Sequence, residues 1–465
     1  MRPTILPALV LALLALVLPG TVHAAKDQIT TFEAPRELLD PAQRPGALAE
    51  LESLGVRHLR VILYWKNVAP APDSRVKPDF DALDPAAYAW GEYDALLDAA
   101  KERGWGVVLT VSGPVPRWAT NGAKDTTTRP SPNEFRKFMT AAAAHFGDRV
   151  TSWSIWNEPN HPQFLQPQYD KRRRPVSPTI YRGLYAAALR GLDDAGDRKP
   201  VLFGETAPVG TRKDVAPLTF IRRALCLNDR YKAIGRCDRL RVDGVAHHAY
   251  TRKAGPFFRP DGPNDVTIGV LGRLTTALDK AARKGVVRRG VPIHLTEFGI
   301  QSLPDPVYGV TQQRQEEYRA ISERIAYRSS RVRSFSQYLL RDDLPRPGAP
   351  AIARYPGFES GLRTSGGRAK LSLSGFRLPL VAERRGARGV RLWGLVRPGD
   401  GARTVEVQVR DGRGSWRRLA VRTTNARGYW SQSTTRRSSR EWRVRWAAPG
   451  GTTYTGAPTR AYKRP

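Results

Sequence analysis

Eight short apolar segments alternate with amphipathic helical segments between Gln28 and about Leu380, and this alternation limits the fold more than any other feature of the sequence. Strands that alternate with helices form parallel sheets, because each helix carries the chain back before the next strand begins. Helices are expected, for example, at Glu92–Arg103, Pro132–Phe146 and Gln313–Tyr327. The strands are expected at Ile29–Phe32, His58–Tyr64, Gly106–Val111, Val150–Trp156, Val201–Gly204, Gly244–His248, Pro292–Thr296 and Arg333–Leu339.

Eight such repeats predict an α/β fold, a closed (β/α)8 or TIM barrel with long loops after its strands. The alternative is an open, doubly wound sheet, which would need a glycine-rich phosphate-binding turn after its first strand. The corresponding segment Thr30–Arg36 contains no glycine, so the barrel is preferred. Gly55, Gly104, Gly285 and Gly290 are expected to end helices before the next strand.

The pattern changes after about Arg384, where short segments of alternating polar and apolar residues follow one another closely. Turns such as Gly399–Gly401 separate them, which is typical of a small β-sandwich. We expect a barrel domain at 25–382 and an all-β sandwich at 383–465, docked together because no long Pro- or Ser-rich linker separates them. The sandwich strands are expected at Gly389–Arg397, Arg403–Arg410, Ser415–Thr423, Gly428–Ser431 and Arg440–Trp446.

The first 24 residues have the pattern of a secretory signal peptide. Arg2 precedes an apolar run from Ile5 to Leu18, and small residues precede the expected cleavage site after Ala24. This pattern predicts a secreted or extracellular mature chain without a membrane span. An uncleaved N-terminal anchor is the alternative, although the run is shorter than the ~20 residues that a spanning helix needs.

Cys226 and Cys237 are the two cysteines of the sequence. In an oxidising compartment they are expected to form one local disulfide, and two buried free thiols are the alternative. So few cysteines exclude a disulfide-dense scaffold and a four-cysteine zinc site. His161 lies near Glu158 but has no histidine, cysteine or acidic partner at the spacing of a metal site, so no metal and no cofactor is expected.

The 465 residues carry a formal net charge of +33, which points to nucleic acid, an anionic membrane or an acidic polymer as partner. Export argues against nucleic acid, and the lack of a basic amphipathic helix argues against a membrane surface. Residues 384–465 hold 20 basic residues against four acidic ones and therefore contribute +16. We expect this domain to hold the protein on an anionic cell-wall polymer; a compositional preference for arginine is the alternative.

Two glutamates follow predicted strands in similar contexts. Glu158 lies in the segment WNEPN after the fourth strand, and Glu297 lies in LTEFG after the seventh. Active sites of such barrels form at the C-terminal ends of the strands, and strands four and seven stand on opposite sides of a narrow mouth. The two carboxyl groups are therefore expected to face each other, unless both pair with arginines as solvated loop residues.

Facing carboxyl groups suit the hydrolysis of glycosidic bonds. One protonates the leaving oxygen, and the other attacks the anomeric carbon when the two lie about 5–5.5 Å apart. Desolvation keeps the acid protonated, whereas hydrogen bonds from cationic or polar groups keep the nucleophile ionised.

These motifs resemble clan A of the glycoside hydrolases, most closely family 39 and its cellulase-like relatives, over residues 29–380. The resemblance implies a retaining mechanism with Glu158 as acid/base and Glu297 as nucleophile. It implies no function for the C-terminal domain.

The resemblance also implies roles for four neighbours. Asn157 would contact the sugar 2-hydroxyl, and Arg60 on the second strand would hydrogen-bond the nucleophile. His248 and Tyr250 match the clan's His-x-Tyr pair, whose tyrosine touches the nucleophile. The alternatives are a salt bridge at the barrel rim for Arg60 and a structural histidine for His248.

The sequence departs from the clan pattern after strands three and eight, where the histidine pair and the tryptophan platform of many relatives are missing. Trp65, Trp118 and Tyr338 lie at strand ends and could stack on sugars, although each could equally pack in the core or rim. Glu205 after the fifth strand is a secondary candidate within the cleft.

The leading hypothesis is a secreted retaining glycoside hydrolase that acts on a β-linked oligosaccharide or polysaccharide. The alternative, from a different functional class, is a non-catalytic glycan-binding or cell-surface protein on a degenerate barrel. A third reading, charge-driven binding of nucleic acid or a membrane surface, is disfavoured by export.

Overall fold

The computed structural model describes residues 27–122, 125–355 and 357–464, so the expected signal peptide at 1–24 lies outside the described residues. Cys226 and Cys237 form the expected disulfide, with their Cα atoms 6.4 Å apart. No helix within the described ranges combines the length and the apolar character needed to cross a membrane.

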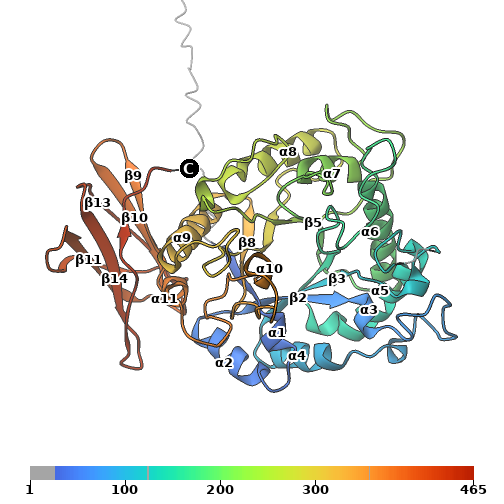
Figure 1. Cartoon of the computed structure of the whole chain (residues 1–465), viewed down its shortest axis with the longest axis horizontal. Helices are drawn as coiled ribbons and strands as arrows, with labels where there is room; N and C mark the ends of the chain where they lie inside the picture. The colour runs from blue at the N-terminus through green and yellow to red at the C-terminus, as the bar shows by residue number, and fades with distance from the viewer. Residues whose placement is uncertain (1–26, 123–124, 356, 465) are drawn as a thin grey trace, which may run out of the picture.

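Eight parallel strands form a closed barrel in sequence order, and the first strand pairs with the eighth to complete it (Figure 1). The closed ring confirms the TIM barrel and excludes the open, doubly wound sheet. Residues along these strands are largely buried because side chains fill the interior and helices cover the outside. The strands are β1 (Ile29–Glu33), β2 (His58–Tyr64), β3 (Gly106–Ser112), β4 (Ser152–Ile155), β5 (Val201–Thr206), β6 (Gly244–His248), β7 (Ile293–Glu297) and β8 (Val332–Tyr338).

Local sequence signals set the ends of the helices around the barrel. The hydroxyl of Ser131 caps α5 (Pro132–Phe146), and Gly104 and Gly285 adopt positive φ angles of 65° and 74° just after α4 and α8. The remaining helices are α1 (Pro35–Leu38), α2 (Arg44–Ser53), α3 (Trp65–Val68), α4 (Gly91–Glu102), α6 (Ser177–Asp194), α7 (Pro217–Ala224), α8 (Gly272–Arg283), α9 (Gln312–Arg328), α10 (Ala351–Arg354) and α11 (Leu371–Arg377).

The C-terminal part forms two antiparallel sheets, one in the order β13-β10-β9 and one in the order β12-β11-β14-β15 with β16 on β14. This arrangement confirms the β-sandwich. The expected boundary at 382/383 falls inside β9, and β9, β15 and β16 were missing from the strands expected from the sequence. The strands are β9 (Leu380–Arg385), β10 (Gly389–Leu395), β11 (Thr404–Asp411), β12 (Arg417–Thr423), β13 (Tyr429–Thr435), β14 (Arg440–Ala447), β15 (Thr453–Thr455) and β16 (Thr459–Arg460).

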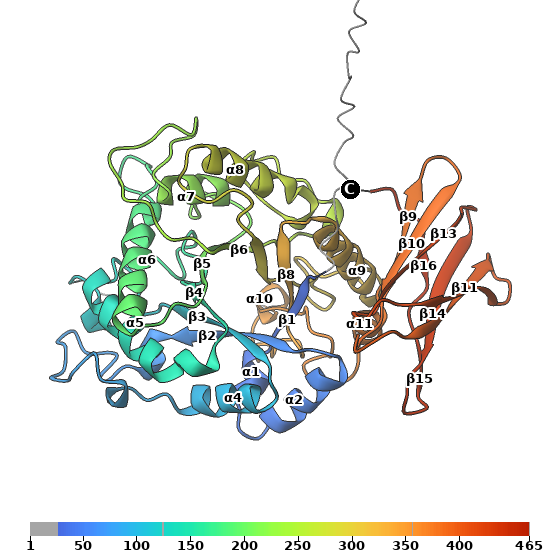
Figure 2. The same cartoon turned by 180° about the vertical axis from the view of Figure 1, so that it is seen from behind.

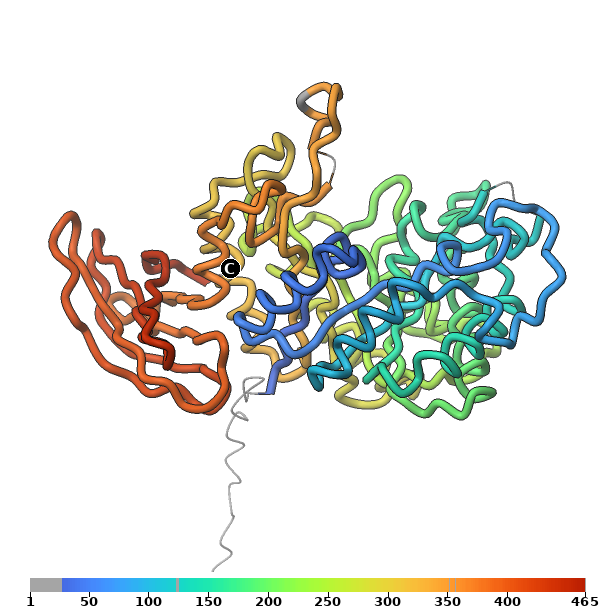
Figure 3. Tube along the Cα trace, turned by 90° about the horizontal axis from the view of Figure 1, so that it is seen from below, coloured from blue at the N-terminus to red at the C-terminus, as the bar shows by residue number. Residues whose placement is uncertain are grey.

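The sandwich packs against α9 on one side of the barrel, so the molecule is elongated (Figures 2 and 3). Ile321 and Tyr327 of α9 share one buried cluster with Trp393 and Tyr429 of the sandwich. Glu383 on β9 lies at the same interface and pairs with four arginines, two of them on α9. Apolar packing and ion pairs therefore dock the sandwich on the barrel.

Candidate active site

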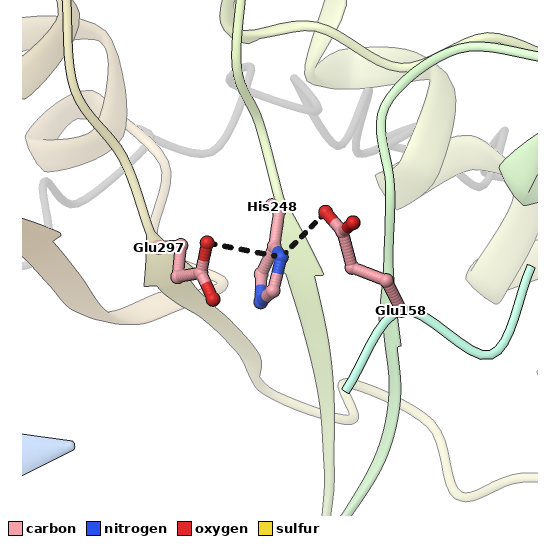
Figure 4. A group of neighbouring side chains, drawn as sticks. All are labelled: Glu158, His248 and Glu297. Atoms are coloured by element: carbon pink, nitrogen blue, oxygen red, sulfur yellow. Dashed lines mark hydrogen bonds and ion pairs between the residues drawn. The ribbon is translucent and has the colours of Figure 1, made fainter. Parts of the chain in front are cut away.

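Glu158 and Glu297 meet at the C-terminal mouth of the barrel. Glu297 ends β7, Glu158 follows β4, and His248 at the end of β6 lies between them (Figure 4). Nδ1 of His248 is 2.9 Å from Oε1 of Glu158 and 3.5 Å from Oε2 of Glu297. One oxygen of each glutamate and the histidine nitrogen all lie within 4.8 Å of one another. The two carboxyl groups therefore face each other across the imidazole.

Arg60, from β2, is the buried centre of this site. Its Nη1 donates to Oε1 of Glu297 at 2.5 Å, and its Nη2 donates to Oδ1 of Asn157 at 2.7 Å. Glu205, at the end of β5, accepts from Nη2 at 2.6 Å and from Nε at 3.2 Å. The guanidinium thus holds the nucleophile candidate, the amide beside Glu158 and a second buried carboxylate in fixed relative positions.

Hydrogen bonds and nearby cations keep Glu297 ionised. Burial raises the pKa of a carboxyl, but His248, Arg60 and the Tyr250 hydroxyl outweigh it and hold the pKa of Glu297 below its ordinary value. The Tyr250 hydroxyl donates to Oε2 of Glu297 at 3.1 Å. Burial lowers the pKa of His248, yet the carboxylates of Glu297 and Glu158 together raise it above its ordinary value.

Glu33, the last residue of β1, belongs to the site and was missed in the sequence. It accepts a short hydrogen bond from Nη1 of Arg60, the same nitrogen that contacts Glu297. Burial raises its pKa to about 8, although Arg60 acts in the opposite direction. Glu33 ends a barrel strand as Glu297 does, so a search for acidic residues at strand ends would have found it.

The backbone is strained where β4 and β5 reach the mouth. Trp156, Glu158 and Glu205 have φ angles of 71°, 37° and 44°, values that residues with a side chain rarely adopt. Such strain persists only where the surrounding structure enforces it, and it is concentrated at functional sites. Here it accompanies two of the carboxyl groups.

Of the aromatic candidates, the structure brings Tyr338 to the site and leaves the two tryptophans in the core. The ring of Tyr338 lies 6.4 Å from Tyr250 and 5.0 Å from Phe358, measured between centroids. Phe358 lies in the long segment after β8, and no sequence signal marked it. Trp65 is fully buried, and Trp118 is 9% exposed and packs edge-on against it. Both pack under the loops, because the short α3 turns Trp65 inward against α5.

Glu158, His248 and Glu297 carry donor types that also bind transition metals. Arg60 and Tyr250 already contact the two oxygens of Glu297, and Arg60 supplies positive charge there. These contacts leave the carboxylate poorly suited to a cation. The absence of a metal and of a cofactor stays a prediction.

The fold and the site together define a closed (β/α)8 barrel with paired glutamates after its fourth and seventh strands. No protein-family model matches the sequence, and no curated protein matches it. Solved structures do match it in fold.

One is a family 39 glycoside hydrolase from Bacteroides cellulosilyticus WH2, with a TM-score of 0.53 and 15% identity over 90% of this chain and 81% of that chain. Another is a glucosidase from Croceicoccus marinus, with a TM-score of 0.50 and 12% identity over 91% and 96% of the two chains. A conserved exported protein from Bacteroides fragilis has a TM-score of 0.50 and 11% identity over 89% and 99%. At such identities the likeness establishes the fold, and it agrees with the barrel of clan A.

Proposed function

We propose that this protein is a retaining glycoside hydrolase that uses Glu158 as acid/base and Glu297 as nucleophile. The observation that carries the proposal is the approach of an oxygen of Glu158 to within 4.8 Å of an oxygen of Glu297. Retaining enzymes hold their carboxyl groups about 5–5.5 Å apart, whereas inverting enzymes leave a wider gap for water. The glycoside hydrolases among the structures of similar fold support the same reaction class.

In the first step, Glu297 attacks the anomeric carbon while Glu158 gives its proton to the leaving oxygen. The bond between the anomeric carbon and the leaving oxygen breaks, and the glycosyl group stays on Glu297. Arg60 and Tyr250 favour this attack because they keep Glu297 ionised before it. Nδ1 of His248 lies 2.9 Å from Oε1 of Glu158 and can exchange a proton with it.

In the second step, Glu158 takes a proton from water, and the hydroxyl displaces Glu297 from the sugar. Oδ1 of Asn157 accepts a hydrogen bond from Arg60, so the amide nitrogen of the same side chain points away from the guanidinium. That amide can donate to a sugar hydroxyl beside the reacting carbon, where hydrogen bonds strengthen in the transition state.

Substitution of either glutamate tests the mechanism. Glu297→Ala should lower kcat on aryl β-glycosides about 10⁴-fold or more, because no nucleophile remains. Glu158→Ala should lose activity on poor leaving groups, and azide should restore turnover of an activated aryl glycoside as a β-glycosyl azide. The products are measured by NMR.

Glu102→Gln, on the exposed end of α4, serves as the control and should behave as the wild type. Full activity of Glu297→Ala would contradict the proposal. A protein that binds glycan while a 2-fluoro sugar fails to label Glu297 would instead be a glycan-binding protein on a catalytically silent barrel.

We further propose that the protein is exported and acts on β-linked glycans. The signal-peptide pattern of residues 1–24 and the disulfide Cys226–Cys237 support export, because such bonds persist in oxidising compartments. The charge of +16 on residues 384–465 supports retention on an anionic cell-wall polymer.

A further inference from the structure

A basic hollow lies beside Glu158 and outside the catalytic cluster. The segments after β4 and β5 form its walls, and its volume is about 760 Å³. Both segments leave the barrel at the C-terminal end of a strand, which is the end that carries the site. The lining residues used below are His161, Tyr169, Arg173, Arg212, Lys213 and Asp214.

The charge of this hollow is strongly positive. Arg173, Arg212 and Lys213 line it and are exposed. Lys171 and Arg172 add exposed positive charge in the same loop, whereas Arg174 pairs with Asp170 at 2.7 Å. Asp214 is the carboxylate of the lining. Its side chain is only 12% exposed, accepts from the hydroxyl of Thr211 and lies 3.4 Å from His161. The outward-facing side chains therefore favour an anion.

The walls are tied together by specific contacts. Arg173 lies 4.3 Å from the centre of the Tyr169 ring, and its Nη2 donates to the carbonyl of Arg212 at 2.6 Å. The Tyr169 hydroxyl donates to the carbonyl of Asp214 at 3.0 Å. These bonds join the segment after β4 to the segment after β5, so the cations are held in a common concave surface.

The hollow begins three residues beyond Glu158. The backbone nitrogen of His161 donates to the carbonyl of Glu158 at 2.8 Å, and Gln168 donates to the carbonyl of Pro159 at 2.9 Å. In the proposed reaction Glu158 protonates the leaving group, whereas Glu297 binds the other sugar. Sugar units on the leaving-group side therefore lie on the Glu158 side of the barrel mouth, which is the side that carries the hollow.

We propose that this hollow binds an anionic sugar unit on the leaving-group side of the scissile bond, and hence that the substrate is an acidic polysaccharide. The inference rests on the proposed glycosidase function. The anion is a carboxylate or a phosphate, because exposed arginine and lysine bind both. A neutral glycan gains hydrogen bonds but no ion pairs from these cations.

Binding to the full chain tests this proposal. In a Glu297→Gln background, which leaves the probes intact, affinity is measured for β-1,4-linked oligoglucuronate, 6-phosphorylated cellohexaose and unmodified cellohexaose. The triple variant Arg173→Ala/Arg212→Ala/Lys213→Ala should bind the preferred charged probe about tenfold more weakly and with a shallower salt dependence. The charged probe that binds more tightly identifies the anion.

The matched control is Arg283→Ala/Lys284→Ala/Arg289→Ala. It removes the same charge from exposed residues at the end of α8 and in the segment before β7, at the opposite end of the barrel. This control variant should bind the charged probe with an affinity within about twofold of that of the Glu297→Gln protein. The single variants Lys213→Glu and Lys284→Glu repeat the comparison in case the triple variant disturbs the loops.

Equal losses in the hollow and control variants would overturn the proposal, because net charge alone would then explain binding. Unchanged affinity in the hollow variants, or tightest binding of unmodified cellohexaose, would also overturn it. Because binding is measured without turnover, failure here differs from failure of the glycosidase proposal, which the activity of Glu297→Ala decides.

Discussion

Arg60 organises the site at the scale of single residues. Its guanidinium contacts Glu33, Glu205 and Glu297, and all of these side chains are buried. If all three carboxyl groups were ionised, their negative charge would exceed the single positive charge of the Arg60 guanidinium. Burial raises the pKa of Glu33 to about 8, so Glu33 stays neutral at pH 7 and the excess negative charge is avoided.

This assignment predicts how stability depends on pH. An unfolded Glu33 has an ordinary pKa, so the folded protein binds the extra proton between about pH 4.5 and 8. The free energy of unfolding should therefore decrease as pH rises through this window, by at most about 1.4 kcal/mol per pH unit. Glu33→Gln should remove that contribution, as measured by urea denaturation from pH 5 to 8.

The exposed Glu102→Gln variant is the control and should follow the wild-type pH dependence. Parallel curves for Glu33→Gln and the wild type would show that Glu33 titrates normally.

At the scale of elements, the segments after β4 and β5 form one unit, which carries Glu158 and begins next to Glu205 at the end of β5. The fully buried side chain of Asn160 joins them. Its Nδ2 donates to the carbonyls of Ala207 and Val215 at 3.1 and 2.9 Å, and its Oδ1 accepts from the nitrogen of Ala207 at 2.8 Å. Both the paired carboxyl groups and the basic hollow depend on this connection.

Asn160→Ala should lower the free energy of unfolding by about 2–4 kcal/mol, because it leaves three buried backbone groups without their partner. It should also reduce kcat, since Glu158 loses its fixed position. The exposed Asn121→Ala should change stability by less than about 0.5 kcal/mol. Equal denaturation midpoints for the two variants would contradict the role of Asn160.

At the scale of the whole molecule, the sandwich completes the surface of the barrel. Deleting it would expose Ile321 and Tyr327 of α9 and leave the cations around Glu383 without their carboxylate. Substitutions of surface arginines are therefore a better test of wall binding than deletion of the domain.

The interface predicts that the two domains unfold together. Trp393→Ala, at a position 3% exposed and packed against Tyr327, should destabilise the whole chain by about 3–5 kcal/mol. Trp416 is half-buried between Arg410 and Arg443 on the other sheet, so Trp416→Ala should lower the free energy of unfolding much less. Calorimetry that shows two separate transitions, with only the sandwich affected by Trp393→Ala, would contradict this coupling.

The spacing of apolar residues was sufficient to predict the barrel, because each strand and each helix has its own local signal. The predicted strand at His58–Tyr64 matches β2 in full, and the one at Gly244–His248 matches β6. The strand β9 was missed because Leu380–Arg385 spans the expected domain boundary and ends in basic residues that continue beyond the turn at Gly386.

The sequence by itself determined the barrel and the sandwich, because their strands have local signals. It also indicated the glutamates that follow strand four and end strand seven, because strand order alone places such residues at one mouth. Only the tertiary structure decided which side chains join them. Glu33 and Phe358 enter the site and Trp65 leaves it, since their positions depend on loop paths and packing between segments far apart in the chain. The basic hollow arises for the same reason, because its cations come from two loops that no local pattern brings together.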